Sequence, residues 1–542
     1  MIAAQIAELL TGVGIRRVYG LPGEDHMALI DAFEAAGLEY VTAFNESSAV
    51  IMAATDAQHT GLPGVVVLSL APGVSNGVNG LLNTYLDQVP LILISGQHPA
   101  HRYPFVTRQG FDIEQLVTPM TKWRARAVPG TDIPGLVGRA VDEAMSGKPG
   151  PVYLEVPDDV ATADPVAPTE AVAAAVEQLR ARWGAAPGRR PAVPAEVADL
   201  RSRLETAERP VLVLAGRRRR VSPETATAFA EAWRLPVFTS SRQKGTVHPD
   251  SPYAAGTFLN GRLERHLFDR SDLVVLVDPD PFDFYNRAWC FDSEAVAFVE
   301  DTFTDWSNPI ARRLVGDPEA SLAALADNPA PASVWTAEDV QGYRDHLRAT
   351  LLPPTETLSV SQAVDAALAV WPRDGYLIAD AGFSKPLVAM LSTPSEPDLY
   401  YASNALSTMG YTVPTAVATR RAVGGRPVLG FLGDGSLLMR ATELMVSTEA
   451  GGPLVYVVVM DRALTQIEVK QERRHLRPVG ATLPELSAAK LGEAFGIEGI
   501  DAHTADDVRA AVGKGLGSDR PVLVGVHVDK QPARELFEVL RG

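Results

Sequence analysis

The feature that most constrains the fold of this chain is the stretch from Phe431 to Glu468, in which two apolar segments are separated by a glycine turn and a helix. The first segment is predicted to be a strand that ends at Leu432. A turn, Gly433-Asp434-Gly435, follows, and a helix is expected to begin at Ser436. After a Gly-Gly-Pro break, a second buried strand is expected over Leu454 to Met460. A strand, a helix and a second strand in this order predict a parallel α/β sheet.

The glycine turn has the character of a phosphate cradle. A turn between a strand and a helix exposes backbone N–H groups, and the helix dipole favours an anion at that end. Asp434 within the turn would repel a phosphate unless a hard cation lies between the two. We therefore predict Mg²⁺ at this place, with Asp434, Asp461 and the backbone carbonyl of Ala463 as its protein ligands.

The spacing of these residues resembles a known signature. Asp434 and Asp461 lie 27 positions apart, and the order Gly-Asp-Gly, helix, strand and ligand resembles the thiamine diphosphate (ThDP) motif of the superfamily of acetohydroxyacid synthases, pyruvate decarboxylases and benzoylformate decarboxylases. By this resemblance, the residues that hold the diphosphate are Gly433, Asp434, Gly435 and Ser436. The motif usually ends in Asn-Asn where this chain has Met460-Asp461, which keeps an oxygen ligand but adds a negative charge. The alternative is an ordinary turn of a parallel sheet that merely contains Asp-Gly.

Length, charge and cysteine content limit the class of protein. At about 150 residues per domain, the 542 residues predict three or four domains. The formal net charge of −17 argues against binding to nucleic acid. Cys290 is the single cysteine, which excludes an intramolecular disulfide and fits a reducing compartment. We find no apolar run of about 18 residues, no signal peptide and no lipidation motif, so we expect a cytoplasmic protein without a membrane segment.

Short apolar runs separated by helical segments recur along the chain and predict an α/β fold of three doubly wound parallel-sheet domains. LILIS from Leu91 is one such run in the first region, 1–160. Similar runs mark a central region, 190–335, and a third region, 355–542. The residues from 158 to 194 are interpreted as a linker that contains a helix. By resemblance to the superfamily, the three regions are a pyrimidine-binding, a central and a diphosphate-binding domain, in that order.

The other end of the cofactor needs a carboxylic acid. Its aminopyrimidine must lose a proton before the thiazolium ring can react, and an acid hydrogen-bonded to a ring nitrogen drives this change most effectively in an apolar pocket. Glu46, in AFNESSAV after the apolar run YVTAF, stands where the superfamily places that glutamate. The alternative role for Glu46 is an acid at a helix N-terminus that interacts with the helix dipole.

Further short segments match the superfamily's cofactor contacts. The run from Ala71 to Asn76 resembles the turn at the pyrimidine edge. In the third region, Asp380-Ala381-Gly382 ends a predicted strand, and Ser407-Thr408-Met409-Gly410 precedes a helix. Met409 stands where the superfamily uses a bulky apolar residue to bend the cofactor. The residues that this resemblance assigns to cofactor binding are Pro72, Gly73, Asn76, Asp380, Gly382, Ser407 and Met409.

The substrate side departs from the pyruvate decarboxylase and benzoylformate decarboxylase patterns. Glu24 can stand for the acid in the first glycine loop of pyruvate decarboxylases, but their paired histidines are replaced by Arg108-Gln109. Their glutamate beyond the metal motif falls on Ile467, beside Glu468. Benzoylformate decarboxylases use a histidine where this chain has Ser69. Simple release of an aldehyde is therefore not the favoured interpretation.

Acetohydroxyacid synthases keep a glutamine at the position of Gln109, and an arginine such as Arg108 is suited to hold a carboxylate. We therefore expect Glu46, Glu24, Arg108 and Gln109 to act on a small-molecule 2-oxo acid, by decarboxylation, by acetolactate synthase-like carboligation or by both. A solvated surface role is the alternative for Arg108 and Gln109. Because the superfamily's cofactor spans two subunits, we expect a homodimer or homotetramer with active sites at the subunit interface.

Two other functions are consistent with the sequence. The first is an FAD-containing synthase or oxidase of the same architecture, although GTFLNGR and DPDPFDF in the central region match the flavin motifs poorly. The run from Arg217 to Arg220 follows a predicted strand where a nucleotide could sit, with a solvated charged loop as the favoured alternative. The second is a relative that has lost turnover and acts as a binding or regulatory subunit, an interpretation suggested by Asp461 and by the missing proton-transfer residues.

Overall fold

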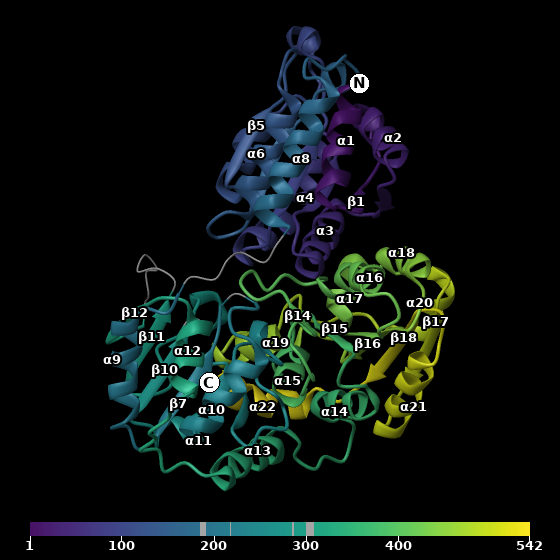
Figure 1. Ribbon diagram of the computed structural model, residues 1–542. Helices are drawn as coiled ribbons and strands as arrows, with labels where there is room; N and C mark the ends of the chain where they lie inside the picture. Colours follow the sequence, from purple (N-terminus) through teal and green to yellow (C-terminus); the bar gives the residue numbers. More distant parts are fainter. Residues whose placement is uncertain (185–190, 217, 285–286, 300–307, 542) are drawn as a thin grey trace. The chain divides into compact units, whose positions relative to one another are not determined.

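The computed structural model describes residues 1–184, 191–216, 218–284, 287–299 and 308–541 (Figure 1). These residues form three six-stranded sheets in which all strand pairs are parallel. This confirms the predicted fold class of three doubly wound parallel-sheet domains. The described residues divide into two compact units, the first made of 1–184, 405–425 and 439–451, and the second of the remainder.

The first unit contains a sheet with the strand order β2-β1-β3-β4-β6-β5. Its inner strands β3, β4 and β6 are buried on both faces, because side chains alternate along each strand and helices cover both sides, whereas the edge strands β2 and β5 are partly exposed. Val65 and Val67 join one buried cluster, whereas Val66 joins another. The strands are β1 (Arg17–Gly20), β2 (Glu39–Thr42), β3 (Gly64–Leu68), β4 (Leu91–Ser95), β5 (Trp123–Arg126) and β6 (Pro151–Glu155).

Helices α1 (Ile2–Val13), α6 (Ile133–Met145) and α8 (Thr169–Trp183) cover one face of this sheet, and α3 (Glu46–Thr60) and α4 (Ala71–Leu86) cover the other (Figure 1). Helix α8 comes from the segment that we interpreted as a linker with a helix, and it packs against α1 and α6. The remaining helices here are α2 (Met27–Ala35), α5 (Ile113–Val117), α7 (Asp158–Ala161) and the 3₁₀ helices η1 (Glu24–His26), η2 (Ala100–Phe105) and η3 (Thr118–Met120).

Two helices from the last third of the chain also belong to the first unit. They are α16 (Thr412–Ala422) and α18 (Glu443–Ala450). Val417 and Val446 from these helices lie in the same buried cluster as Val50 of α3. Residues far apart in sequence therefore support helix α3 from outside its own sheet.

The second unit contains two sheets, and the one earlier in sequence has the order β12-β11-β10-β7-β8-β9. Its strands are β7 (Pro210–Leu214), β8 (Val237–Thr239), β9 (Ala254–Thr257), β10 (Leu273–Val277), β11 (Glu294–Val299) and β12 (Arg312–Val315). Its helices are α9 (Pro194–Leu204), α10 (Pro223–Trp233), α11 (Arg265–Phe268), α12 (Pro318–Ala326), α13 (Ala337–Leu351), η4 (Ser241–Gln243) and η5 (Pro281–Asp283).

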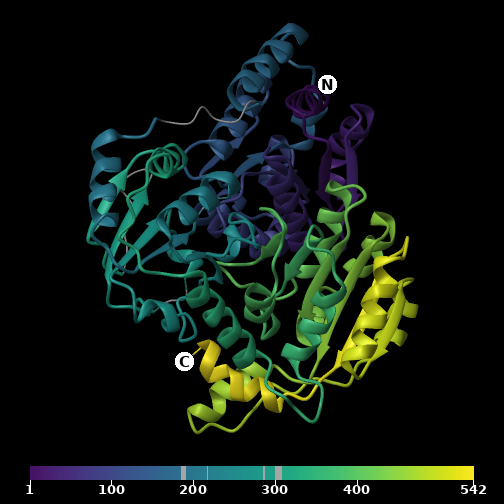
Figure 2. The same cartoon turned by 60° about the horizontal axis from the view of Figure 1, so that its bottom comes forward.

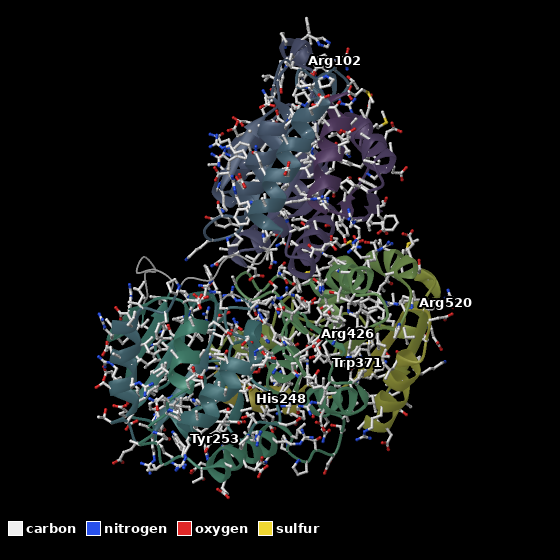
Figure 3. All side chains as sticks on the ribbon, in the orientation of Figure 1. Arg102, His248, Tyr253, Trp371, Arg426 and Arg520 are labelled. Carbon is white, nitrogen blue, oxygen red and sulfur yellow. The ribbon has the colours of Figure 1, made fainter. Side chains whose placement is uncertain are left out.

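The last sheet has the order β14-β13-β15-β16-β18-β17, and its strands appear as adjacent green and yellow arrows in Figure 2. They are β13 (Tyr376–Ala379), β14 (Tyr400–Ala402), β15 (Val428–Gly433), β16 (Leu454–Met460), β17 (Glu498–Ala502) and β18 (Val522–His527). The helices are α14 (Val360–Val370), α15 (Ser384–Leu391), α17 (Asp434–Arg440), α19 (Thr465–Arg473), α20 (Ala488–Phe495), α21 (Ala505–Leu516) and α22 (Gln531–Arg541). Arg426, labelled in Figure 3, lies just before β15 and covers the Tyr376 ring at 5.1 Å from its centroid.

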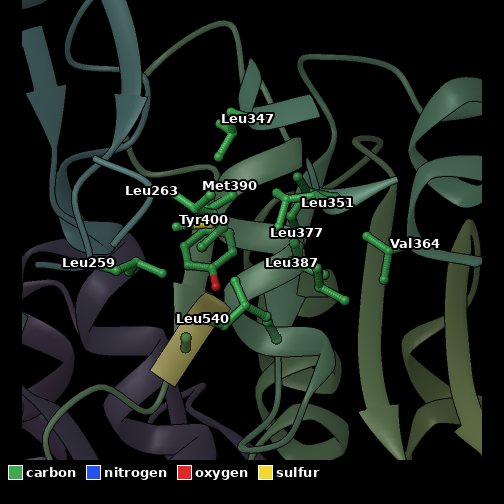
Figure 4. Close-up of a cluster of buried hydrophobic side chains, with 14 of the residues drawn as sticks. Leu259, Leu263, Leu347, Leu351, Val364, Leu377, Leu387, Met390, Tyr400 and Leu540 are labelled. Carbon is green, nitrogen blue, oxygen red and sulfur yellow. The ribbon is translucent and has the colours of Figure 1, made fainter. Parts of the chain in front are cut away.

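The two sheets of the second unit share one apolar core. Leu259 follows β9 and Leu347 lies on α13, whereas Leu377 lies on β13 and Leu387 on α15 (Figure 4). All four side chains are at most 6% exposed. Burial of this apolar surface is the main stabilising contribution to the arrangement, at about 25 cal/mol per Å² removed from water.

Local sequence sets the ends of many helices. Ser359 accepts a hydrogen bond from the N–H of Gln362, whose side chain in turn accepts the N–H of Ser359, so α14 begins with a capping box. Helix α3 ends at Gly61, whose φ of 74° is readily adopted by glycine. Among the described residues, none of the helices combines the length and the apolar character that crossing a bilayer requires.

Candidate active site

The candidate site of the last sheet lies where the strand order reverses. Strand β14 lies on one side of β13 and β15 on the other, and ligands of open α/β sheets bind beyond the carboxyl ends of strands at such a point. Asp380 follows β13, and Gly433 ends β15. The Ser436 hydroxyl donates a hydrogen bond of 3.0 Å to Oδ1 of Asp380, which is fully buried. The structure thus brings together the predicted cofactor residues at the ends of these two strands.

The glycine turn leaves room for a ligand. A Cβ atom built on Gly433 or on Gly382 would meet no other atom within 4 Å. The helix that follows, α17, begins at Asp434 and not at Ser436, so the predicted helix start was two residues late. The reason is local, because Asp434 caps its own turn by accepting the N–H of Gly435 at 2.8 Å. Since the Gly435 N–H is engaged by Asp434, a diphosphate would have to use the other N–H groups of the turn and of the first turn of α17.

Two carboxyl groups lie close together beside this turn. Asp434 is 2% exposed, and its Oδ2 accepts the N–H of Arg462 at 2.9 Å. Asp461 follows β16, where its Oδ1 accepts the N–H of Ala463 at 3.1 Å and its Oδ2 accepts the Thr465 hydroxyl at 2.5 Å. Burial, and next the charge of Asp461, raise the pKa of Asp434 to about 6. Burial also raises the pKa of Asp461 above its ordinary value.

This pair fits a divalent cation. Two desolvated carboxylates repel each other, and a cation between them would reverse that repulsion. Each oxygen that accepts one N–H or O–H keeps a second lone pair for a metal. No cluster of three or more His, Cys, Asp or Glu side chains that could hold a metal occurs in the described part of the chain. A pair of carboxylates with a diphosphate and water is, however, the usual environment of Mg²⁺.

The backbone after Asp461 adopts an unusual conformation. Arg462 has a φ of 59°, in the left-handed region that non-glycine residues seldom occupy. This conformation directs the Arg462 N–H toward Asp434 and sets the position of Ala463, the predicted carbonyl ligand. The sequence offers no signal for this role of Arg462, since glycine or asparagine is the usual residue in that region.

Glu46 is the first residue of helix α3 and is partly buried. Asn45 caps the helix by accepting the N–H of Ser48 at 3.3 Å. The side-chain amide of Asn76 on α4 donates a hydrogen bond to Oε2 of Glu46. The structure therefore joins two of the residues that the resemblance assigned to the pyrimidine end of the cofactor. It also places Glu46 at a helix N-terminus, as the alternative interpretation required.

The predicted turn over residues 71–76 is helical, because α4 already begins at Ala71. Pro72 and Gly73 lie in its first turn, where proline is well tolerated. Ser407 has a φ of 52°, and Met409 is partly buried two residues later. Between them, the Thr408 hydroxyl donates a hydrogen bond of 2.8 Å to Oδ1 of Asn79 on α4. The loop that carries Met409 is thereby attached to the helix that carries Asn76.

Glu24, Arg108 and Gln109 occupy exposed positions. Glu24 begins η1, and the other two follow η2, which is exposed throughout and whose Arg102 is labelled in Figure 3. Within the part of the chain that the structure describes, no hydrogen bond links these three residues to Glu46. The structure gives them no catalytic geometry within the chain, and their assignment remains a prediction.

Asp25 was missed by the sequence analysis. Its carboxylate accepts the Ser69 hydroxyl at 2.7 Å and the N–H of Leu70 at 2.8 Å, directly before α4. Although burial acts in the opposite direction, hydrogen bonds from His26 and Ser69 lower the pKa of Asp25. Asp25 therefore holds the start of the helix that carries Asn76. Nothing in the sequence distinguishes it from Glu24 beside it.

Glu468 does not face the solvent as a free acid. It is 5% exposed, and its Oε2 lies 2.7 Å from Nζ of Lys530 and 3.4 Å from Nη1 of Arg534. Both cations belong to the end of the chain around helix α22. Glu468 thus attaches α19, the helix after Asp461, to α22.

The strand order of the second sheet reverses between β7 and β10. The N–H of Gly216, after β7, donates a hydrogen bond of 2.6 Å to Oδ2 of Asp283. Nε of Arg242 donates a hydrogen bond of 2.5 Å to Oδ1 of the same carboxylate. Arg217 of the predicted arginine run lies outside the described residues. Arg218 and Arg219 form ion pairs with Asp398, and Arg220 lies 3.7 Å from Asp278. Carboxylates of the chain itself therefore occupy this crevice.

Comparison with known families agrees with the geometry. Three models of thiamine pyrophosphate enzymes match the chain: the N-terminal TPP binding domain over residues 1–116, the central domain over 197–325 and the C-terminal TPP binding domain over 380–526. The chain belongs to the thiamine diphosphate-dependent enzyme superfamily. This confirms the resemblance drawn from the Gly-Asp-Gly motif, and the C-terminal match covers both Asp434 and Asp461.

Full-length relatives in this ThDP superfamily include decarboxylases and synthases. A probable 2-ketoarginine decarboxylase of Pseudomonas aeruginosa is 29% identical over 540 residues, covering 96% of this chain and 92% of the relative. An acetolactate synthase of Bacillus subtilis is 24% identical, over 97% and 93% of the two chains. A benzoylformate decarboxylase of Pseudomonas aeruginosa is 26% identical, over 96% and 97%. The chain is therefore similar to ThDP enzymes of more than one reaction type.

Proposed function

We propose that this protein is a ThDP- and Mg²⁺-dependent enzyme that decarboxylates a 2-oxo acid, releases the product or ligates it to an acceptor, or does both. The observation that carries the proposal is the pair of neighbouring carboxyl groups beside the open turn at Gly433, of which Asp434 is buried and Asp461 partly buried. Such a pair is unfavourable by itself and becomes favourable when a cation and a diphosphate occupy the turn.

Each residue has a defined role in this proposal. Asp434, Asp461 and the Ala463 carbonyl would hold Mg²⁺, and the turn from Gly433 to Ser436 would bind the diphosphate. When bound, ThDP supplies the electron sink that makes loss of carbon dioxide from a 2-oxo acid feasible. Glu46 would exchange a proton with a ring nitrogen of the aminopyrimidine, and Asn76 orients the Glu46 carboxyl group.

The substrate class comes from the relatives. Their names include decarboxylases of the 2-oxo acids 2-ketoarginine and benzoylformate, as well as acetolactate synthases. For this chain we propose a 2-oxo acid, with Arg108 positioned to bind its carboxylate and with Gln109 and Glu24 near the reacting group. Glu24 begins η1 after β1, and Arg108 and Gln109 follow η2 after β4, so all three lie in segments beyond strands of the first sheet, where catalytic side chains of α/β folds are commonly found.

An FAD-dependent activity is the less favoured alternative. A dinucleotide bound to the second sheet would need the N–H groups beyond β7, and the Gly216 N–H is engaged by Asp283. A non-catalytic role is also less favoured, because the chain keeps Glu46, Asn76, Asp434 and Asp461, which the proposed cofactor and metal sites would need. By analogy with the superfamily we propose a homodimer or homotetramer whose active sites combine residues of two subunits.

A substrate screen tests the proposed function. The purified protein is loaded with ThDP and Mg²⁺ and offered a panel of aliphatic, aromatic and guanidino 2-oxo acids, each with and without an aldehyde acceptor. Carbon dioxide release and product mass are measured, and absorbance near 450 nm reports any bound flavin. We expect carbon dioxide from at least one acid in a colourless protein. Absence of ThDP binding by calorimetry would refute the proposal.

A further inference from the structure

Helix α18 begins with a buried acid that the proposed chemistry does not use. Glu443 is 0% exposed, although it lies in a helix whose neighbouring Met445 is 46% exposed. Its Oε2 accepts the backbone N–H of Phe44 at 3.3 Å. Phe44 lies two residues before Glu46, at the point where the chain leaves β2 and enters α3. Burial of a carboxyl group costs free energy unless hydrogen bonds compensate for the lost water.

The surroundings of Glu443 are polar but incompletely paired. Oε1 of Glu443 and the fully buried hydroxyl of Ser48 make no hydrogen bond of good geometry among the described residues, although the hydroxyl lies close enough to the carboxyl group to influence its pKa. Burial raises the pKa of Glu443 to about 7, against opposing effects of the Phe44 and Asn45 N–H groups, the Ser48 hydroxyl and the Arg440 charge. At neutral pH the carboxyl group can therefore donate to Ser48 as an acid or accept from it as an anion.

A second contact ties the same segment to α4. Nη2 of Arg440 donates a hydrogen bond of 2.9 Å to Oδ1 of Asn79, and the same oxygen accepts the hydrogen bond from the Thr408 hydroxyl. Asn79 lies one helical turn after Asn76, the partner of Glu46. Glu443 thus engages the start of α3, and Arg440 engages the middle of α4, the two helices that carry the Glu46–Asn76 pair. Residues around 440 belong to the C-terminal matched domain, whereas those two helices belong to the N-terminal one.

We propose that Glu443 is a positioning residue that fixes the N-terminus of α3 and thereby sets the orientation of the Glu46 carboxyl group toward the pyrimidine ring of ThDP. This inference rests on the proposed function for the role of Glu46. Glu443 does not contact the cofactor in this proposal. It acts through the Phe44 N–H and through Ser48, which flank Glu46 in the sequence. A displacement of about 1 Å at a proton-transferring group can reduce a rate roughly 100-fold.

The experiment compares Glu443→Ala, Glu443→Gln and the control Glu449→Gln, which alters an exposed acid on the same helix. Amide hydrogen exchange of peptides covering residues 40–52 is measured in the apoprotein by mass spectrometry. In the protein loaded with ThDP and Mg²⁺, exchange of the thiazolium C2 proton with deuterium is measured by NMR. The second measurement needs no substrate and reports the step that Glu46 is proposed to drive.

We expect Glu443→Ala to speed amide exchange over residues 40–52 and to slow C2 exchange about 10- to 100-fold, with ThDP affinity changed less than about threefold. Glu443→Gln keeps an acceptor for Phe44 and a donor for Ser48, so it should restore most of both properties. Glu449→Gln should match the wild type. Wild-type amide exchange over residues 40–52 together with C2 exchange within twofold of wild type in Glu443→Ala would overturn the proposal.

If Glu443→Ala does not fold, the pH dependence of amide exchange decides the matter. After correction for intrinsic exchange, the wild-type peptides over 40–52 should show a step near pH 7 as Glu443 ionises, and Glu443→Gln should lack it. A step that persists in Glu443→Gln contradicts the proposal. Loss of ThDP binding in the wild type would instead refute the proposed function, while the apoprotein result would still test Glu443.

Discussion

The side-chain amide of Asn76 donates a hydrogen bond to the carboxyl group of Glu46. Asn76 lies in the second turn of α4 and Glu46 is the first residue of α3, so the contact joins these two helices at the proposed proton-transfer group. The pairing engages Oε2 of Glu46, so that in the proposed function Oε1 would be the oxygen that faces the cofactor.

Replacing Glu46 by Gln should leave ThDP binding intact and impair proton transfer to the cofactor. The amide keeps the size of the side chain but cannot exchange a proton, so we expect C2 exchange of bound ThDP to fall about 10²- to 10⁴-fold. Calorimetric ThDP affinity should change less than about threefold, because the metal and diphosphate contacts lie elsewhere. Glu34→Gln, an exposed acid of α2, is the control. Near-normal C2 exchange in Glu46→Gln would falsify the assigned role.

Replacing Asp434 by Ala should abolish Mg²⁺-dependent retention of ThDP, because the turn would lose its buried carboxylate ligand. Isothermal titration with and without Mg²⁺ checks this expectation. The exposed Asp506 provides a matched control as Asp506→Asn. Unchanged ThDP affinity in Asp434→Ala would show that the turn does not hold the metal.

Asp461→Asn tests the charge that distinguishes this chain from the usual motif. The amide oxygen can still bind Mg²⁺, while loss of the negative charge removes one cause of the raised pKa of Asp434. We expect ThDP retention with Mg²⁺ affinity weakened by about tenfold, and a metal-free protein that is more stable by about 1 kcal/mol. Titration calorimetry and thermal unfolding in EDTA measure the two effects. Loss of stability in the metal-free variant would contradict the repulsion between Asp434 and Asp461.

Glu443 should make the stability of the apoprotein depend on pH. Its pKa is about 7 in the folded chain and near 4.5 when unfolded, so the folded state holds a proton that the unfolded state has released between these values. Stability therefore falls as pH rises from about 4.5 to 7, by up to about 1.4 kcal/mol per pH unit, and levels off above. Glu443→Gln should lack this decline, and its free energy of unfolding should exceed that of the wild type at pH 8. Denaturant unfolding at pH 5, 6, 7 and 8 measures the difference in free energy of unfolding between the variant and the wild type. This difference would be the same at every pH if Glu443 did not titrate.

Glu468→Gln should weaken the attachment of α22. The change leaves Lys530 and Arg534 without their buried partner, and because both cations are partly exposed we expect a loss of about 1 to 3 kcal/mol. Limited proteolysis should then release the C-terminal segment more readily. Glu472→Gln removes a more exposed partner of Arg534 and should cost less than about 1 kcal/mol. Equal effects of the two substitutions would argue against a special role for Glu468.

Much of the local structure around the glycine turn was predictable from the sequence because strands, turns and helix ends depend on neighbours along the chain. The strand from Leu454 to Met460 has the predicted bounds. The Gly-Gly-Pro break before it and the acid after it limit the apolar run, and an uninterrupted apolar run is typical of a strand buried in a parallel sheet. The helix start at Asp434 was placed two residues late, because an aspartate that caps its own turn looks the same in sequence as one that precedes the helix.

The sequence by itself determined the three-sheet architecture, the superfamily and the candidate residues Glu46, Asp434 and Asp461. Three features were decided only by the tertiary structure. Asp461 lies close enough to Asp434 to raise the pKa of Asp434, and Glu468 forms an ion pair with Lys530. Glu443 is buried against Phe44, which lies 399 positions away in the sequence. The physical reason is the distance along the chain over which each interaction acts. Strand, turn and capping preferences act over a few residues, whereas desolvation and charge pairing depend on which distant segments the packed core brings together.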